Sequence, residues 1–269
     1  MLNFYKLLYT SIFLALFAGS FHSYGQRTIV DNLTHFDDRK LHFGFYLGLN
    51  TMDYRTTNYN NVFDNPVFND PTTGLKAKAL NYYGNKTNFA AEVYSISPGF
   101  TVGGVINYRL TRDLDFRFTP GMSLGNRIFK YFIPINPDVY SQSQGVDEKT
   151  YLSTPSSYVD IPVGIRYKGF RHNNVRPYIY LGTAYRYDLE NKRISESVVH
   201  LDKGGGYAEL GLGLDSYLEY FRFTLEFRFS YGLNNLIRHD SDQSKPVPYY
   251  GFIFKELDSN IFTLLFYFE

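Results

Sequence analysis

Eight segments of this chain alternate apolar and polar residues with a period of two, and this alternation restricts the fold more than any other feature of the sequence. In residues 221–231, FRFTLEFRFSY, the apolar and aromatic side chains fall on one side of an extended strand, and the charged and hydroxyl side chains fall on the other. The connections between the segments are long, short, long, short, long, short and long in turn. This rhythm predicts an antiparallel sheet with its long loops at one end and its short turns at the other.

The predicted strands have the lengths and the loop pattern of a membrane barrel. They cover roughly residues 42–50, 93–109, 114–127, 158–168, 178–186, 205–218, 221–231 and 260–269. A tilted transmembrane strand needs roughly 9–11 residues, whereas strands of soluble sheets have about 5–6. Short turns on one side and long loops on the other are typical of bacterial outer-membrane proteins. We therefore predict an all-β fold, an eight-stranded antiparallel transmembrane β-barrel with short periplasmic turns and long extracellular loops. A soluble all-β domain is the alternative.

One face of these strands is apolar and is predicted to meet lipid, which makes outer-membrane lipid the first expected partner. Its residues are Phe43, Phe45, Leu47, Phe116, Phe118, Ile161, Val163, Leu210, Leu212, Phe223, Leu225, Phe227, Phe229, Phe262, Leu264, Phe266 and Phe268.

The opposite face carries almost all of the charges within the strands and is predicted to line the lumen. Its charged residues are Asp115, Arg117, Arg127, Asp160, Arg166, Lys168, Arg186, Glu209, Asp215, Arg222, Glu226 and Arg228. An eight-stranded barrel is just wide enough to be filled by its own side chains, and isolated buried charges would be costly. We therefore expect a mutually paired network with a structural role. A proton or ion path along these residues is the alternative.

Glycines and prolines on the strands give two further expectations. The inner-face glycines are expected to make room for the long arginine side chains; they are Gly99, Gly103, Gly121, Gly125, Gly164, Gly182, Gly211 and Gly213. Pro120 and Pro162 lie inside predicted strands, where proline removes a hydrogen bond of the ladder, and so they predict bulges.

The last predicted strand, NIFTLLFYFE, must pair with residues 42–50 if the barrel is to have no open edge. Phe262, Leu264, Phe266 and Phe268 share one face of this strand, and Glu269 falls on the other. The final aromatic residue is therefore one position before the last residue of the sequence.

The N-terminal 41 residues are predicted to precede the barrel, which spans 42–269. Residues 1–25 read as a secretory signal, with Lys6 before an apolar run and small residues, Ser23 and Gly25, before a cut at Gln26. A single transmembrane anchor is the alternative, although the run is short for a span. Residues 26–41 have mixed charge and no period, and are expected to form a periplasmic lead-in.

Composition excludes several function classes. A formal net charge of +1 gives no reason to expect nucleic acid as a partner. The absence of cysteine excludes a disulfide framework, a thiolate metal site and a lipid-anchored cysteine. Mean hydropathy is slightly negative, which excludes a helical membrane bundle but suits a barrel with a polar lumen.

Three stretches resemble the PorT family of outer-membrane proteins: KLHFGFYLGLNTMDYR, FTVGGVINYRLTRDLDFRFTPGMSLGNR and YVDIPVGIRYKGFRHNNVRPYIYLGTAYRYDLE. The similarity covers most of the chain from about residue 41 onward. It implies a component needed for type IX protein secretion, which exports large surface proteins and gliding adhesins across the outer membrane. It implies no catalytic residues. Because an eight-stranded barrel is too narrow for a folded cargo, the resemblance implies an accessory role through contacts with other secretion-system proteins.

No catalytic, cofactor-binding or metal-binding residues are predicted, and no small-molecule substrate is identified. Among the histidines, only His200 and His239 fall in predicted outer loops, and the sequence from His239 to Asp242 invites comparison with a hydrolytic dyad or a metal site. Gly204 to Gly206 lacks the lysine of a phosphate-binding loop and is expected to begin a strand. A small barrel enzyme and a passive structural or adhesion barrel are the alternatives to the secretion role.

Aromatic residues in the predicted long loops are expected either to contact proteins or to pack on one another over the barrel mouth. They are Tyr54, Tyr59, Phe63, Phe68, Tyr82, Tyr83, Tyr131, Phe132, Tyr140, Tyr249, Tyr250 and Phe252.

Overall fold

A computed structural model describes residues 30–69, 74, 76–77, 80, 90–132, 149–189, 201–237 and 253–269. The chain divides into two compact units, Met1–Asp31 and Asn32–Glu269, and every strand belongs to the second. The predicted signal segment lies outside the described residues.

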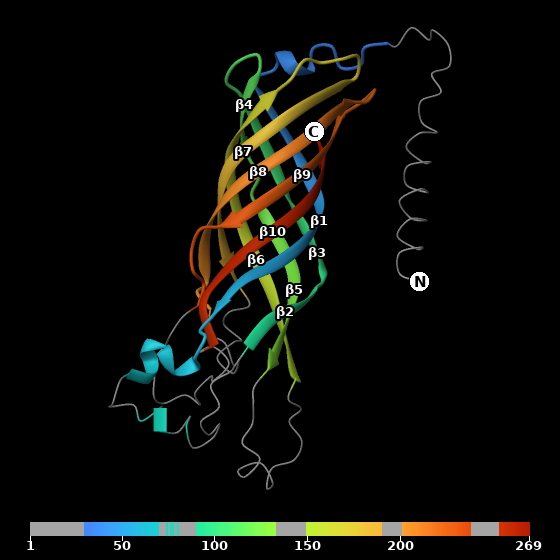
Figure 1. Cartoon of the computed structure of the whole chain (residues 1–269). Helices are drawn as coiled ribbons and strands as arrows, with labels where there is room; N and C mark the ends of the chain where they lie inside the picture. The colour runs from blue at the N-terminus through green and yellow to red at the C-terminus, as the bar shows by residue number, and fades with distance from the viewer. Residues whose placement is uncertain are drawn as a thin grey trace, which may run out of the picture. The chain divides into compact units, whose positions relative to one another are not determined.

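The second unit is a single antiparallel sheet (Figure 1). Its strands are β1 (Leu41–Asn58), β2 (Ala90–Ile96), β3 (Pro98–Arg109), β4 (Leu114–Phe118), β5 (Gly121–Phe132), β6 (Lys149–Lys168), β7 (Val175–Asp188), β8 (Gly204–Tyr217), β9 (Arg222–Gly232) and β10 (Phe254–Phe268). Only Ser97 separates β2 from β3, and only Thr119 and Pro120 separate β4 from β5. The 10 strands therefore occupy eight positions in the sheet, which confirms the predicted fold class with two positions divided.

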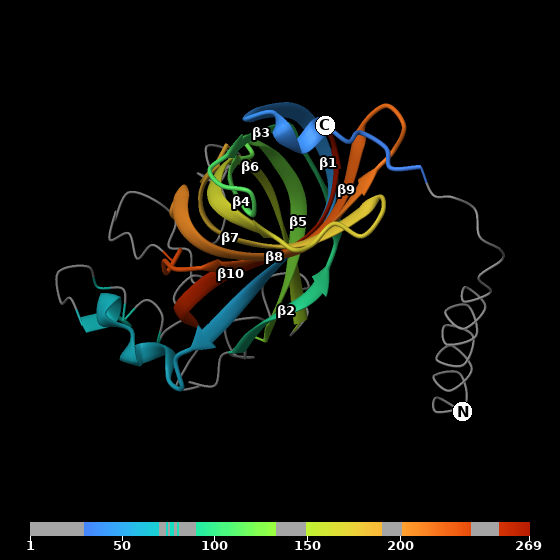
Figure 2. The ribbon, with the colours of Figure 1, turned by 90° about the horizontal axis from the view of Figure 1, so that it is seen from above.

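The sheet closes into a barrel because β1 pairs with both β10 and β3. Leu47 lies opposite Phe266 of β10 on one edge and opposite Val102 of β3 on the other. Figure 2 shows the strands encircling a common axis. The predicted pairing between the last strand and residues 42–50 is thus confirmed.

The two ends of the barrel are built differently. Short turns at residues 110–113, 169–174 and 218–221 lie at one end, with the start of β1 and the end of β10; we call this the turn end. The long connections lie at the other end, which we call the loop end. The predicted segregation of short and long connections is confirmed.

Neither of the two prolines inside the predicted strands forms a bulge. Pro120 lies in the interruption between β4 and β5, but the register with β6 is the same on both sides of it, with Phe118 opposite Val163 and Gly121 opposite Asp160. β6 runs without a register shift through Pro162. The carbonyl of Pro162 accepts a 3.2 Å hydrogen bond from the amide of Thr119. In an antiparallel ladder the amide and carbonyl of a residue face the same neighbour, so the missing N–H of Pro162 faces that interruption. The predicted bulges at Pro120 and Pro162 are therefore both wrong, because the strand register does not shift at either residue.

Several strands extend further toward the loop end than the alternation predicted. β1 continues to Asn58, β5 to Phe132 and β10 back to Phe254, while β6 begins at Lys149. These residues were assigned to long loops because their composition is polar, so the predicted strand limits are wrong at this end.

Short 3-10 helices lie outside the strands: η2 (Phe36–Asp38), η3 (Val62–Asp64) and η4 (Pro66–Asn69). Among the described residues, no helix is long and apolar enough to cross a membrane.

Candidate functional site

The structure places the whole predicted lipid-facing set on the outside of the barrel, where none of these side chains is buried. Phe43 and Phe227 are 63 % and 62 % exposed. Aromatic rings also pack against one another along the outer surface: Phe45 and Phe268 are stacked with centroids 5.0 Å apart, and Phe229 and Phe262 are tilted with centroids 4.7 Å apart. This surface has the composition of a lipid-facing band.

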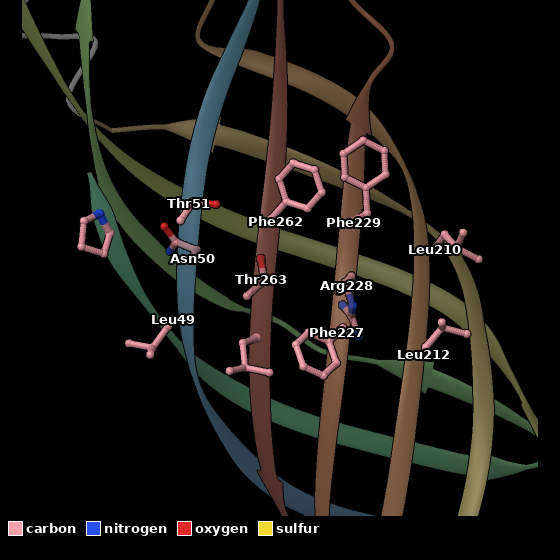
Figure 3. Close-up of a pocket in the computed structure, with 12 residues that line it drawn as sticks. Leu49, Asn50, Thr51, Leu210, Leu212, Phe227, Arg228, Phe229, Phe262 and Thr263 are labelled. Atoms are coloured by element: carbon pink, nitrogen blue, oxygen red, sulfur yellow. The ribbon is translucent and has the colours of Figure 1, made fainter. Parts of the chain in front are cut away.

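An apolar groove of about 560 Å³ lies on the same outer surface, across β8, β9, β10 and β1 (Figure 3). Leu210, Leu212, Phe227 and Phe262 line it, and each is at least half exposed. Arg228 contributes to the lining, but its side chain is buried on the inner side of the strand. The groove therefore belongs to the lipid-facing surface, and its accessible lining is almost entirely apolar.

The direction of the apolar side chains reverses toward the loop end. On β1 they point outward as far as Leu49, but the next apolar side chain, Met52, is buried while Arg55 points outward. On β10 the outward apolar side chains begin at Phe262, and toward the loop end from there Ile261 and Leu257 are buried; Leu265 is an inward exception within the lipid-facing stretch. Met52 pairs with Ile261, so both strands change at one level. Where the outside of the barrel meets lipid, apolar side chains point outward; where it meets water, they point inward. This level therefore marks the edge of the lipid-facing band.

The structure places the predicted lumenal charges inside the barrel, where every one of them is buried. They come from β4 to β9, so residues far apart in the sequence meet across the lumen. Arg117, for example, lies 2.8 Å from Glu226 and 3.0 Å from Glu269.

Nearly all of these charges form one continuous chain in which the sign alternates. The order is Asp160, Arg186, Glu209, Arg228, Glu226, Arg117, Glu269, Arg222, Asp215, Arg166, Asp115 and Lys168. Each neighbouring pair is in ion-pair contact, and acids and bases are equal in number along the chain. We call these residues the lumenal chain; its neutrality and burial fit a structural role.

Arg127 was expected in the same network but is not part of it. Its side chain is fully buried, and its contacts are the hydroxyl groups of Tyr54, Ser156, Tyr158 and Ser259. No described carboxylate lies within ion-pair distance of it.

Glu269 was not among the predicted network residues, although its place in the alternation put it on the inner face. It contacts Arg117 and Arg222, and it accepts a hydrogen bond from Asn107. Glu269, the residue that follows β10, is thus a member of the lumenal chain.

The inner-face glycines make room mainly for tyrosine rings. A Cβ atom at Gly103 or Gly121 would collide with Tyr46, and one at Gly164 or Gly182 would collide with Tyr180. Among these glycines, Gly211 alone would meet a member of the lumenal chain, Glu226. The expectation that the glycines accommodate arginine is therefore wrong: the flat rings fill the gaps, and the guanidinium groups lie on the rings. Arg228, for example, lies 4.1 Å from the Tyr180 centroid.

The lead-in is folded across the turn end from Asn32 to Lys40. Phe36 stacks on His42 with centroids 4.3 Å apart, and Arg222 lies 4.7 Å from the Phe36 ring. The carboxylate of Asp37 lies 3.2 Å from Arg176 and accepts a 2.7 Å hydrogen bond from Tyr217. We call residues 32–40 the turn-end segment; no period in the sequence signalled it.

Asp37 is held in its charged form. Burial raises the pKa of its carboxyl group, but the hydrogen bond from Tyr217 and the charges of Lys168, Arg222 and Arg176 outweigh burial and lower the pKa below 3.8.

The loop end is filled by apolar side chains. We call this the outer cluster: Tyr54, Val62, Phe68, Ala91, Phe129, Leu201, Leu236, Ile237, Ile253, Phe254 and Leu257. Phe63 packs against it. Of the predicted loop aromatics, Tyr54, Phe63 and Phe68 therefore pack over the mouth; Tyr82, Tyr83, Tyr140, Tyr249, Tyr250 and Phe252 lie outside the described residues, as do the side chains of Tyr131 and Phe132.

The histidines considered for catalysis, His200 and His239, lie outside the described residues. Within the described part of the chain, His35 contacts Asp38 on the surface and His42 bonds the Arg39 carbonyl. No group of three His, Asp or Glu side chains in that part is arranged to hold a metal ion.

A family model described as "Outer membrane protein beta-barrel domain" matches residues 24–238. No curated protein sequence matches the chain significantly. Among solved structures, Neisserial surface protein A is 8% identical, with 86% of this chain and 99% of that chain covered and a TM-score of 0.40. OprG from Pseudomonas aeruginosa is 11% identical, with 84% and 92% covered and a TM-score of 0.38. Ail of Yersinia pestis, solved with the heparin analogue sucrose octasulfate, is 9% identical, with 84% and 96% covered and a TM-score of 0.36. At such identities and scores these structures carry no argument about function.

Proposed function

The chain belongs to the outer membrane protein β-barrel domain family, which makes it an integral outer-membrane protein, and on that premise we propose that it serves type IX protein secretion as a non-enzymatic accessory barrel. Its partners are other proteins of the secretion system, which it meets at the two ends of the barrel. Outer-membrane lipid surrounds its apolar band.

The observation that carries the proposal is the filled interior. The lumenal chain occupies the middle of the barrel, the turn-end segment lies across one end and the outer cluster fills the other. A barrel of eight strand positions has no width left beyond its own side chains. A protein of this kind acts through its surfaces, because its lumen has no space for a cargo.

The choice of type IX secretion in this proposal rests on the resemblance of three stretches to the PorT family. The stretch that includes NTMDYR, residues 50–55, crosses the edge of the lipid-facing band, where Met52 and Tyr54 turn inward. The resemblance therefore includes a part of β1 that stands beyond the lipid and is available to partners.

The turn end offers a second contact surface. Short turns of outer-membrane barrels face the periplasm. Phe170 and Tyr220 lie in two of these turns and are 96 % and 83 % exposed. Exposed aromatic side chains of this kind are common in protein interfaces.

A deletion strain tests the proposal. Loss of the protein should block surface delivery of type IX cargo while other outer-membrane proteins still insert normally. Complementation with the F170A/Y220A variant should restore barrel assembly but only part of the secretion. The control variant R112A removes an exposed charge from the remaining short turn, residues 110–113, and should restore both. Normal cargo delivery in the deletion strain would eliminate the secretion role.

The alternatives give different outcomes in the same strains. If the protein is a passive structural barrel, deletion should weaken the outer membrane without a specific loss of cargo. If it is an enzyme of the outer loops, substitution of His200 and His239 by alanine should remove the phenotype-rescuing activity while the turn variants remain active.

A further inference from the structure

The apolar groove on the outer surface runs across the strands and not along them. It lies between two rows of outward side chains that the strand register places next to each other (Figure 3). The row nearer the turn end is Leu49, Leu264, Phe227 and Leu212. The row nearer the loop end is Pro98, Thr51, Phe262, Phe229 and Leu210. Asn50, Thr263 and Arg228 fall between the rows in the same register and form the floor.

The groove has the length and the width of one lipid chain. Neighbouring strands are about 4.8 Å apart, so the four intervals from β3 through β1, β10 and β9 to β8 make it roughly 19 Å long. The two rows are two residues apart along each strand, which is about 7 Å. A helix with its side chains is about 10–12 Å wide and does not fit between them. One leaflet contributes half of a hydrocarbon core of roughly 30 Å, so the groove can hold most of an extended acyl chain.

The groove is inclined, with its β1 end nearer the loop end. Leu49 lies further from the turn-end limit of β1, Leu41, than Leu212 lies from the turn-end limit of β8, Tyr217. Thr51 directly precedes Met52, the level at which the lipid-facing band ends. Because the short turns of outer-membrane barrels face the periplasm, the β1 end of the groove opens toward the outer leaflet.

A half-exposed cation lies just beyond the groove. Tyr231 is the outward residue that follows Phe229 on β9, and the guanidinium of Arg55 lies 5.0 Å from its ring centroid. The Nε and Nη2 of Arg55 donate to Asp258, and these two bonds leave some of its five N–H groups for another acceptor. The side chain of Arg55 is 53% exposed and that of Asp258 only 14%. A lipid headgroup at this level therefore meets mainly the positive charge.

An acceptor stands between this cation and the groove. Asp53 follows Thr51 on the outward face of β1 and is partly exposed. One oxygen of its carboxylate accepts the amide of Tyr54, and the other is available to a hydroxyl donor. The outer edge of the groove thus offers donors for an anionic group and an acceptor for a hydroxyl group.

We propose that the groove holds one acyl chain of an outer-leaflet glycolipid and that Arg55 and Asp53 bind the phosphorylated sugar of this lipid. Its phosphate oxygens accept charge-assisted hydrogen bonds from Arg55, and a sugar hydroxyl donates to Asp53. The outer leaflet is the source because the β1 end of the groove, where these residues lie, opens toward it. The site depends on the outer-membrane setting of the barrel and not on the secretion role.

Fluorescence quenching by brominated lipid tests the proposal, because the chain contains no tryptophan. L214W places a single reporter on β8 in the next outward row beyond Leu212, and I165W places one on β6, away from the groove. The probe is lipid A with brominated chains, mixed as a minor component into phosphatidylethanolamine bilayers. Lipid A beside L214W should appear enriched about 3–10-fold over its mole fraction, whereas quenching of I165W should follow the mole fraction.

Variants made in the L214W chain separate the two parts of the site. R55Q should remove most of the enrichment, whereas R112Q, which changes an exposed cation at the turn end, should keep it. L212A lowers one wall of the groove and should reduce the enrichment, whereas I161A shortens an outward side chain of β6 and should not. The shift in gel mobility on boiling shows that each variant is folded.

Three results would overturn the proposal. Quenching of both reporters in proportion to the mole fraction would mean that the groove contacts only unselected lipid. Enrichment of brominated phosphatidylethanolamine in place of lipid A would mean that a phospholipid occupies it. Protection of L214W from both brominated lipids would mean that a second barrel covers it.

Discussion

At the scale of single residues, Arg117 shows how much the lumen depends on complete pairing. Its guanidinium is fully buried and contacts Glu226, Glu269, Tyr178 and Asn107. Replacement by glutamine breaks the lumenal chain in the middle and leaves two carboxylates with fewer cations. Because an uncompensated buried charge is strongly unfavourable, R117Q should lower the free energy of unfolding by about 3–5 kcal/mol, measured by urea titration of the refolded barrel.

The same substitution on the surface is the matched control. Arg55 lies 3.1 Å from Asp258, but its side chain is 53% exposed. Water screens such a pair, so R55Q should change stability little. Equal losses for R117Q and R55Q would contradict the structural role of the lumenal chain.

Asp37 makes the turn end sensitive to acid. Because its pKa is lower in the folded protein than its ordinary value of 3.8, its contribution to stability is complete above about pH 4 and is lost as the pH falls through the folded-state value. D37N should therefore destabilise the barrel at neutral pH by roughly 1–2 kcal/mol. At about pH 3 the difference in free energy of unfolding between D37N and the natural chain should be smaller than at neutral pH.

Unfolding titrations at several pH values check this prediction. If D37N loses as much free energy of unfolding in acid as at neutral pH, the aspartate acts through its shape and not through its charge. D38N is a suitable control, because Asp38 lies on the same short helix and its side chain is 72 % exposed.

At the scale of the strands, the alternation fixed the orientation of side chains but not the strand limits. The position of each residue in the alternation was enough to place Phe262 outside and Glu269 inside, without knowledge of the neighbouring strands. It failed at the loop end because the apolar face changes sides there. Met52 is apolar and inward while Asp53 is polar and outward, so a search for one continuous apolar face ends at Asn50.

Pairing could not be predicted in the same way. Asp160 and Glu209 both contact Arg186, and these residues come from three strands. Their contact depends on strand register and lumen width, which the sequence pattern does not give. For the same reason, nothing in the sequence distinguished Arg127 from the paired arginines, and nothing showed that residues 32–40 return to the barrel.

The closure of the barrel by β1 and β10 can be tested directly, because the chain contains no cysteine. Leu49 and Leu264 lie opposite each other across this seam. Opposed residues have Cβ atoms roughly 4.5–5.5 Å apart, near the range of a disulfide, whereas diagonal neighbours are about 7–8 Å apart. L49C/L264C should therefore form a disulfide on oxidation, and the cross-linked chain should keep an altered gel mobility after boiling.

The diagonal pair L49C/F262C serves as the control, because Phe262 lies opposite Thr51. It should cross-link slowly or not at all. Equal cross-linking of the two pairs would show that the register at the seam is not fixed, and failure of both would show that the first and last strands do not meet.

At the scale of the whole barrel, three different kinds of filling succeed one another along the axis. A polar segment held by Asp37 lies at the turn end, the neutral lumenal chain lies in the middle, and the outer cluster lies at the loop end. Each kind suits its surroundings: water at the first, the lipid-enclosed wall around the second, and water again around the extended strands of the third. The barrel thus crosses the membrane with its interior filled by side chains, and its two ends are free for contacts.

A barrel whose interior is filled in this way should not conduct ions. In planar lipid bilayers the protein should give no resolved current steps, because the side chains that fill a barrel of this width leave no continuous water path. A general porin in the same bilayers provides the positive control, and the shift in gel mobility on boiling shows that the inserted protein is folded. Steady current that scales with the amount of folded protein would contradict the filled lumen. It would also favour the ion path that the alternating charges of the lumenal chain, from Asp160 to Lys168, would then provide.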